Sequence, residues 1–369
     1  MKVLYISARA DIGGGQEHMY QLISGLGLRV EAIVACPREM PYWERFYGLD
    51  NVSVMLEIPK RKFRLSALYK LIRRVSQLQV ELIHSHGKGA GLYARLISAL
   101  TKVPVVHTFH GLHIDEYNRV ARKVYCAYEK LAGKKTAVGI CVSPGERDQI
   151  ARLNFLEPRK LRVIANGVRV PCTAAVKSPL PGQLVVSSVS RFNYHKNPDL
   201  IIKIAESLKD KIQSFQVVIA GRGSDSDETE FLRKVEVSAV SSNIILLGGV
   251  ECIRDALRDS HVFLSTSRWE GLPLSVLEAM SEGVPCVVTD VVGNRDAVQS
   301  GISGYLFPLN EPGVAAEHIA RLATDSTLWH RISSGASRNV MECYSVEAMA
   351  RSTNQEYLRV LGDVAHIGS

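Results

Sequence analysis

The 369-residue sequence lacks several features that mark other classes of protein. It has no run of about 18 consecutive apolar residues, so we expect no membrane-spanning helix. The apolar stretch at residues 3–6 is too short for a signal peptide and is expected to form a first strand. Repeats of fixed period and low-complexity tracts are also missing. With 46% hydrophobic residues, the sequence predicts an ordinary globular protein of about two domains.

Cysteine is sparse, and its spacing excludes two kinds of site. The seven cysteines are scattered and odd in number, and no Cys-x-x-Cys pair occurs. A disulfide framework and a structural zinc site are therefore not indicated. Reduced cysteines that pack as small apolar side chains are typical of the cytoplasm, which is the expected location.

Two common nucleotide-binding motifs are absent as well. Three glycines at residues 13–15 follow the first predicted strand and precede a predicted helix. Neither Gly-x-Gly-x-x-Gly nor the Gly-Lys-Ser/Thr of a P-loop is present, which excludes both motifs. A glycine-rich turn still allows the backbone to approach a phosphate.

Acidic residues are scarce in the first half of the chain. Residues 1–170 contain 27 Lys and Arg against 14 Asp and Glu, a net charge of +13, whereas the remainder has a net charge of −5. This asymmetry favours a polyanionic partner for the first half, either nucleic acid or an anionic membrane. Basic and aromatic residues do not alternate as in RNA-binding proteins, so nucleic acid is the weaker alternative.

Residues 60–74 contain seven basic residues and no acid, with apolar residues at helical spacing. The segment predicts an amphipathic helix, which either packs on its sheet with a solvated charged face or rests on anionic lipid. One helix can do both, so the alternatives remain open.

A phosphate site is predicted within residues 262–281. A short apolar strand at 262–264 is followed by a small polar turn and by a helix from about Pro273. The backbone amides from Gly271 to Ser275 lack helical partners and lie at the positive end of the helix dipole. Glu270 can reach the hydroxyls of a group held there, and Glu278 can accept hydrogen bonds from a vicinal diol such as that of a ribose.

A second cationic loop follows the strand that begins at Leu184. Arg191 and Lys196 lie five residues apart on this strand–helix loop. They are either two solvated cations or a diphosphate clamp, in which Arg191 forms bidentate hydrogen bonds and Lys196 acts as a point charge. The clamp is the interpretation that we prefer.

Predicted strands and helices alternate along the chain, which indicates an α/β fold with doubly wound parallel sheets. Residues 171–183 are rich in Pro, Ala, Ser and Gly and predict a linker. The chain therefore divides into residues 1–170 and residues from 184 onward.

These motifs resemble those of the retaining glycosyltransferases of family 4, including their Glu-x7-Glu motif at Glu270 and Glu278. The resemblance covers essentially the whole chain. It implies the GT-B fold, with two facing Rossmann-like domains and an active site in the cleft between them. Residues 1–170 would bind the acceptor, residues 184–344 would bind the nucleotide-sugar, and a final helix within residues 345–369 would cross back to the first domain.

The resemblance also implies roles for individual residues. His110 would face the donor sugar, and Gly14 and Gly15 would lie near the diphosphate. The implied catalytic residues are His110, Glu270, Arg191 and Lys196. The implied donor-binding residues are Gly14, Gly15, Arg191, Lys196, Glu270, Gly271, Leu272, Pro273, Leu274 and Glu278. Two positions depart from the family pattern, because His261 and Asp296 stand where Asp and Glu are usual.

No metal and no cofactor is expected. His84, His86, His107 and His110 could be imagined as a zinc cluster, but no carboxylate or Cys completes one at normal spacing. Residues 225–227 spell Asp-x-Asp, which binds a divalent metal in single-domain sugar transferases. Here the surrounding Gly, Ser and Asp residues predict a polar surface turn instead.

The resulting hypothesis is retaining transfer of a hexose from a UDP- or GDP-sugar to a glycan or polyprenyl-linked acceptor. Surface polysaccharides such as O-antigen (lipopolysaccharide), capsule or exopolysaccharide are the expected products. The enzyme would lie on the cytoplasmic face of an anionic membrane. The alternatives are a sugar-nucleotide epimerase or phosphorylase of similar architecture and a non-catalytic scaffold in a polysaccharide assembly complex.

Overall fold

A computed structural model describes residues 1–112, 114, 117–171, 178–179, 184–250, 253–257 and 259–367, with side chains up to residue 363. The chain forms two compact units, residues 1–167 together with 346–369 and residues 168–345. None of the described helices is both long enough and apolar enough to span a membrane. Most of the predicted linker, at 172–177 and 180–183, lies outside the described residues.

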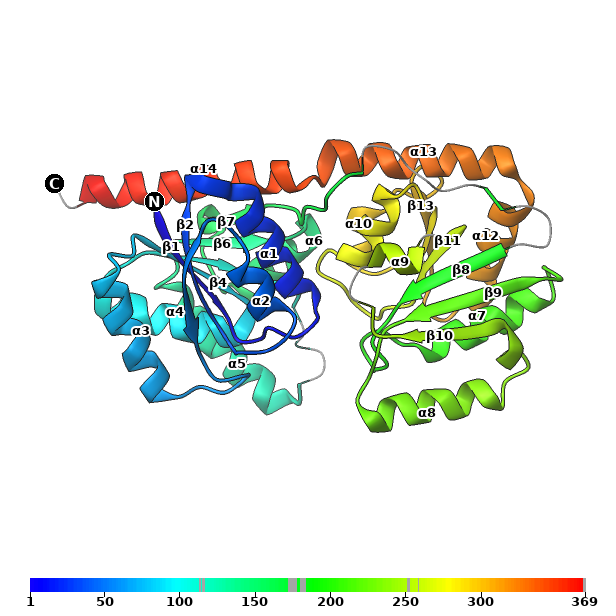
Figure 1. Cartoon of the computed structure of the whole chain (residues 1–369), viewed down its shortest axis with the longest axis horizontal. Coiled ribbons are helices and arrows are strands. Elements are labelled where there is room, and N and C mark those ends of the chain that lie inside the picture. The colour runs from blue at the N-terminus through cyan, green and yellow to red at the C-terminus, as the bar shows by residue number, and fades with distance from the viewer. Residues whose placement is uncertain are drawn as a thin grey trace. The chain divides into compact units, whose positions relative to one another are not determined.

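Unit 1 contains a seven-stranded parallel sheet with helices on both faces (Figure 1). In sheet order the strands are β3 (Val52–Glu57), β2 (Glu31–Cys36), β1 (Lys2–Ser7), β4 (Leu82–His86), β5 (Val105–Thr108), β6 (Val138–Cys141) and β7 (Leu161–Val163). The helices are α1 (Gly14–Leu26), α2 (Tyr42–Tyr47), α3 (Leu65–Gln77), α4 (Gly87–Thr101), α5 (Arg119–Gly133), α6 (Pro144–Leu153) and α14 (Val346–Ile367).

The central strand β1 separates two apolar cores in unit 1. Val3 and Tyr5 pack with α1 and α14, whereas Leu4 and Ile6 pack with α3 and α4. Successive side chains of a strand point to opposite faces, so a strand covered on both faces must be apolar throughout. This requirement explains the continuous apolar runs in the sequence.

Unit 2 contains a six-stranded parallel sheet, also covered on both faces. In sheet order the strands are β10 (Ile244–Gly248), β9 (Phe215–Ala220), β8 (Leu184–Val189), β11 (Val262–Ser265), β12 (Cys286–Thr289) and β13 (Gly304–Phe307). The helices are α7 (Asp199–Lys209), α8 (Asp225–Glu236), α9 (Ile253–Leu257), α10 (Leu274–Ser281), α11 (Asn294–Ala297), α12 (Pro312–Thr324) and α13 (Ser326–Cys343). The predicted α/β class with two doubly wound sheets is confirmed.

Each sheet reverses its winding direction once. The reversal lies between β1 and β4 in unit 1 and between β8 and β11 in unit 2. Open α/β sheets bind ligands outside the carboxyl ends of the strands at such a switch point. The loops that follow these four strands are therefore where a functional site is expected.

Two local predictions were wrong. The basic segment at residues 60–74 is not one helix, because α3 begins only at Leu65 and Arg64 before it is extended. Lys60 forms an ion pair with Glu39. The Asp-x-Asp sequence at 225–227 is not a turn, because it forms the start of α8 with Ser224 as its N-cap. Acidic side chains at a helix N-terminus are stabilised by the helix dipole, which accounts for these aspartates without a metal.

Candidate functional site

The switch point of unit 2 is built from two loops that hold each other in place. The loop at 190–198 follows β8, and the loop at 266–273 follows β11. The Thr266 hydroxyl donates to the Lys196 carbonyl (2.9 Å), and the Arg268 amide donates to the His195 carbonyl (2.9 Å). The Arg268 guanidinium also donates to Asn197 Oδ1 (2.8 Å). These bonds fix the two predicted charged positions relative to one another.

Lys196 and Glu270 meet at this point. Lys196 Nζ donates to Glu270 Oε1 at 2.6 Å, and the Glu270 side chain is 10% exposed. Burial alone would raise the pKa of Glu270, but the charge and the hydrogen bond of Lys196 outweigh it and hold the pKa below its usual value. Glu270 is therefore ionised at neutral pH and can only accept hydrogen bonds.

His195 is a site residue that the sequence analysis did not single out. Its Nε2 donates to the Trp269 carbonyl (2.6 Å), and its ring stacks on the Trp269 indole with centroids 5.0 Å apart. Burial lowers the pKa of His195, so the ring is neutral at pH 7 and its 3.7 Å approach to Glu270 is not an ion pair. The position of His195 next to Lys196 forms no sequence pattern from which its stacking on Trp269 could be predicted.

The loop that carries Glu270 rests against Gly293. Gly293 has a φ of 71°, and a Cβ there would lie 2.7 Å from the Gly271 carbonyl oxygen and 2.8 Å from that of Glu270. A side chain at position 293 would therefore push Glu270 out of place. The Thr289 hydroxyl adds a second restraint by donating to the Ser267 carbonyl (2.6 Å).

Helix α10 begins as predicted, with Pro273 in extended conformation just before it. Leu272 and Leu274 are buried in the core, so an anion at this turn would meet the backbone of the helix N-terminus rather than these side chains. Glu278 is half-buried on the same helix, and Arg191 is exposed at the start of the other loop. The structure therefore brings Lys196, Glu270 and the α10 N-terminus together, with Arg191 and Glu278 on the same two elements.

The predicted residues of unit 1 meet at its own switch point. Gly14 and Gly15 are the first residues of α1, directly after the β1 loop. His110 follows β5 and adopts a φ of 63°. A Cβ on Gly15 would lie 3.8 Å from the His110 ring, so the glycine turn and His110 are neighbours.

His110 belongs to a cluster of five imidazoles, together with His18, His84, His86 and His107. One hydrogen bond joins two of the rings, His86 Nδ1 with His110 Nε2 (3.0 Å). Neighbouring polar groups hold the other three rings: His18 Nδ1 with Asn166 Oδ1 (2.8 Å), His84 Nε2 with the Thr108 hydroxyl (2.8 Å) and His107 Nδ1 with the Ser85 hydroxyl (2.9 Å). Burial lowers the pKa of every ring, that of His18 to about 4. The cluster is therefore neutral at pH 7.

Within this cluster, the nitrogens of His18, His86 and His110 lie within 4.8 Å of one another and could hold a metal ion. The set differs from the four histidines considered in the sequence. His18 comes from α1 and is 68 residues away from His86, so no spacing pattern connects them. Asn166, which orients His18, was missed for the same reason.

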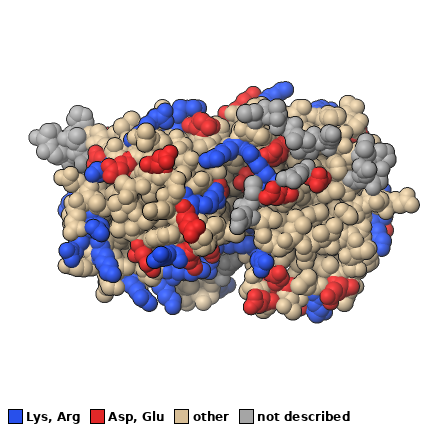
Figure 2. Space-filling model, viewed as in Figure 1, with Lys and Arg blue, Asp and Glu red and all other residues tan. Residues whose placement is uncertain are grey.

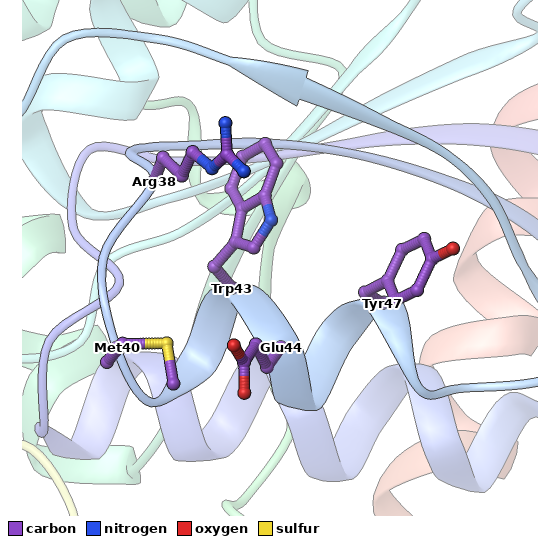
Figure 3. Close-up of a pocket in the computed structure, with 5 residues that line it drawn as sticks. All are labelled: Arg38, Met40, Trp43, Glu44 and Tyr47. Atoms are coloured by element: carbon purple, nitrogen blue, oxygen red, sulfur yellow. The ribbon is translucent and has the colours of Figure 1, made fainter.

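A shallow pocket of about 520 Å³ lies beside α2 in unit 1 and is lined by Arg38, Met40, Trp43, Glu44 and Tyr47. Figure 3 shows the Arg38 guanidinium next to the Trp43 ring and Tyr47 one turn further along α2. None of the predicted site residues lines it. Helix α2 is nevertheless tied to α1, because Arg45 forms an ion pair with Glu17 (2.7 Å).

Comparison with known proteins gives matches to both halves of the chain. Residues 12–170 match the family described as "Glycosyltransferase Family 4", and residues 174–339 match "Glycosyl transferases group 1". Among structures, the chain is similar to Anabaena HepE in complex with UDP-glucose, with a TM-score of 0.83, 17% identity, and coverage of 98% of this chain and 100% of that one. This likeness establishes the two-domain GT-B fold.

Two curated relatives come from Escherichia coli. The UDP-Gal:alpha-D-GlcNAc-diphosphoundecaprenol alpha-1,3-galactosyltransferase is 30% identical over 295 residues, which cover 75% of this chain and 73% of that protein. The O-antigen biosynthesis glycosyltransferase WbnH is 26% identical over 298 residues, which cover 80% and 83%. The chain is therefore a glycosyltransferase of GT-B fold that belongs to the group 1 glycosyl transferases of family 4.

Proposed function

We propose that the enzyme transfers a hexose from a UDP- or GDP-sugar to a glycan or polyprenyl-linked acceptor, with retention of anomeric configuration, in the synthesis of a surface polysaccharide such as O-antigen or capsule. The names of the two Escherichia coli relatives support this pathway, and the UDP-glucose complex of HepE supports a nucleotide-sugar donor. The observation that carries the proposal is the Lys196–Glu270 pair at the unit 2 switch point.

The donor binds at this switch point. Lys196 has three N–H donors, so it can keep its bond to Glu270 and still donate to a phosphate oxygen. Arg191 provides a second, bidentate cation, and the α10 N-terminus provides backbone amides. Glu270 accepts hydrogen bonds from sugar hydroxyls because its lowered pKa keeps it ionised. Glu278 accepts hydrogen bonds from the ribose diol.

The charges at this site suit a departing nucleoside diphosphate. Negative charge grows on the diphosphate as the glycosidic bond breaks, and fixed cations stabilise it without reorganising. Retention by double displacement would need a carboxylate nucleophile close to the anomeric carbon. Glu270 is already held by Lys196 and is assigned to the sugar hydroxyls. We therefore assign a front-face reaction, in which the acceptor oxygen enters on the side from which the phosphate leaves and the phosphate takes the acceptor proton.

Unit 1 contributes His110 and the acceptor site. The neutral His110 ring donates or accepts a hydrogen bond to the donor sugar, and Gly14 and Gly15 allow the backbone to approach the diphosphate. A Cβ at position 15 would already be in van der Waals contact with the His110 ring, 3.8 Å away. No metal is required by this chemistry, because Arg191 and Lys196 neutralise the leaving group.

The enzyme rests on an anionic membrane surface through unit 1, and α5 is the best candidate for the contact. Val120, Val124 and Leu131 lie on one face of α5 at helical spacing and are 72%, 65% and 67% exposed. Arg119, Lys123 and Lys130 border this face on one side. Figure 2 shows Lys and Arg side chains along the lower edge of unit 1, where Figure 1 places α3 and α5. An exposed apolar face with a basic border is typical of helices that lie on membranes.

A donor screen tests the proposal. Purified enzyme is incubated with radiolabelled UDP- and GDP-sugars and a membrane extract that contains polyprenyl-linked glycans. The proposal predicts transfer of label from one donor to the lipid fraction. Interconversion of free sugar nucleotides would indicate an epimerase, and absence of turnover would indicate a scaffold. Thermal shift identifies the donor in advance, since a ligand at 100 times its dissociation constant stabilises the protein by about 2.7 kcal/mol.

A further inference from the structure

Three of the five clustered imidazoles face one another. His18 lies on α1, His86 ends β4, and His110 follows β5. The ring centroids of His18 and His110 are 4.6 Å apart, and those of His86 and His110 are 5.3 Å apart. One nitrogen from each ring lies within 4.8 Å of the other two.

The hydrogen bonds around these rings indicate where their protons and lone pairs lie. Asn166 Oδ1 accepts from His18 Nδ1, which leaves the lone pair of the neutral His18 ring on Nε2. His86 Nδ1 and His110 Nε2 share a single proton at 3.0 Å. His86 is only 6% exposed, and its Nε2 has no partner among the described residues. Each neutral ring has one N–H and one lone pair, so the three rings together offer three lone pairs to an ion.

The two remaining histidines are excluded by their own contacts. His84 uses both ring nitrogens, with the hydroxyls of Tyr357 (2.5 Å) and Thr108 (2.8 Å). His107 Nδ1 is engaged by the Ser85 hydroxyl (2.9 Å). His84 and His107 therefore lie beside the three facing rings but are not counted as ligands. His84 packs on His86 with centroids 4.2 Å apart.

We propose that His18, His86 and His110 form a binding site for a single divalent transition-metal ion, Zn²⁺ or the chemically similar Co²⁺ or Ni²⁺. Imidazole nitrogens are preferred ligands of these ions. Zn–N bonds of about 2.0–2.1 Å place neighbouring ligand nitrogens roughly 3.3 Å apart. The His86–His110 pair is already at 3.0 Å, and the third nitrogen closes the site by a small side-chain rotation. Asn166 orients His18 as outer partners of ligand histidines do.

The ion competes with the reaction rather than assisting it. This consequence rests on the proposed function, which assigns His110 to the donor sugar. A metal ion occupies the His110 lone pair and draws its ring toward His18 and His86. The bound ion therefore inhibits transfer, and a chelator restores it. The binding site itself depends only on the geometry of the three rings.

Cobalt is the direct probe, because tetrahedral Co²⁺ has an intense visible absorption that octahedral aqueous Co²⁺ lacks. The full-length protein is titrated with Co²⁺ alone, and Zn²⁺ is then added to displace it. We expect one tetrahedral Co²⁺ per chain, lost in His18→Gln and His86→Gln. The matched control is His330→Gln, which removes an exposed histidine on α13. Binding that is absent, or unchanged in both cluster variants, overturns the site.

A measurement on the unaltered protein covers the case in which a variant does not fold. Histidine-selective NMR follows the eleven imidazoles during Zn²⁺ addition. Perturbation of His18, His86 and His110 with retained signals elsewhere supports the site, and perturbation of other histidines alone overturns it.

Transfer assays then separate the two proposals. Zn²⁺ inhibition that is lost in His18→Gln supports both, whereas Zn²⁺ binding without inhibition keeps the metal site and removes His110 from the donor sugar.

Discussion

At the scale of single residues, the account depends on charges that two neighbouring strands place side by side. Lys196 and Glu270 are 74 positions apart in the sequence and 2.6 Å apart in unit 2. Each is held by its own loop, and the two loops are joined by hydrogen bonds from the Thr266 hydroxyl and the Arg268 amide. Substitutions at these positions should therefore separate charge effects from structural ones.

Arg191→Ala should reduce turnover by about 10²–10³, the loss found when one charge-stabilising group is removed from a transition state. The reason is that negative charge develops on the diphosphate that Arg191 is proposed to bind. Steady-state kinetics with the identified donor measures the effect, and Arg331→Ala on α13 is the matched control. Turnover of Arg191→Ala within a factor of three of the control would remove Arg191 from the clamp.

Lys196→Met should raise the pKa of Glu270, because burial then acts without the opposing charge of Lys196. The acidic limb of the pH profile of kcat/KM is expected to move to higher pH. Leaving Glu270 buried without its partner should also cost roughly 3 kcal/mol of unfolding free energy. The double variant Lys196→Met, Glu270→Gln should recover most of this stability but not the activity. An unshifted acidic limb in the single variant would contradict the pairing.

At the scale of secondary-structure elements, the sequence predicted the alternation of strands and helices because strands covered on both faces are continuously apolar. The start of α10 was predicted from the glycine and proline before it. Residues 60–74 were assigned to one helix, but the Arg61 amide donates to the Ala8 carbonyl and the Arg64 amide donates to the Tyr93 hydroxyl, which places these residues outside α3. Long-range contacts of this kind leave no pattern in the sequence.

The same limit applies to the candidate site. Glu270, Glu278, Arg191 and Lys196 stand in motifs of fixed spacing and could be named from the sequence. His195 could not, because its role depends on stacking against Trp269 from another loop. His18 and Asn166 are joined across 148 positions, and only the folded sheet brings them together.

Helix α5 was not singled out in the sequence and gives the prediction that belongs to this scale. Arg119→Gln with Lys123→Gln and Lys130→Gln should weaken binding to anionic vesicles about five-fold for each residue, since each basic residue near such a surface contributes about 1 kcal/mol. Vesicle sedimentation at two salt concentrations measures the change. The comparison variant replaces Lys60, Lys62 and Arg64, which precede α3, by Gln. If the comparison variant loses more vesicle binding than the α5 variant, the membrane contact lies on the segment before α3.

At the scale of the whole molecule, the parallel sheets of the two units reverse direction in the same way, but different residue types gather at their switch points. Unit 2 gathers cations, a carboxylate and a helix N-terminus at its switch point, whereas unit 1 gathers neutral imidazoles and glycines. The first set suits a charged leaving group and the second suits an uncharged sugar. The proposed reaction needs neither a protein nucleophile nor a metal, with the departing phosphate as the base.

The anomeric configuration of the product tests this account most directly. Transfer is run in the presence of EDTA with the donor identified in the screen, and proton NMR of the product reports the coupling of the newly linked anomeric proton. The account predicts the configuration of the donor, formed at an undiminished rate after chelation. An inverted product, or activity that EDTA abolishes and Mn²⁺ restores, would contradict it.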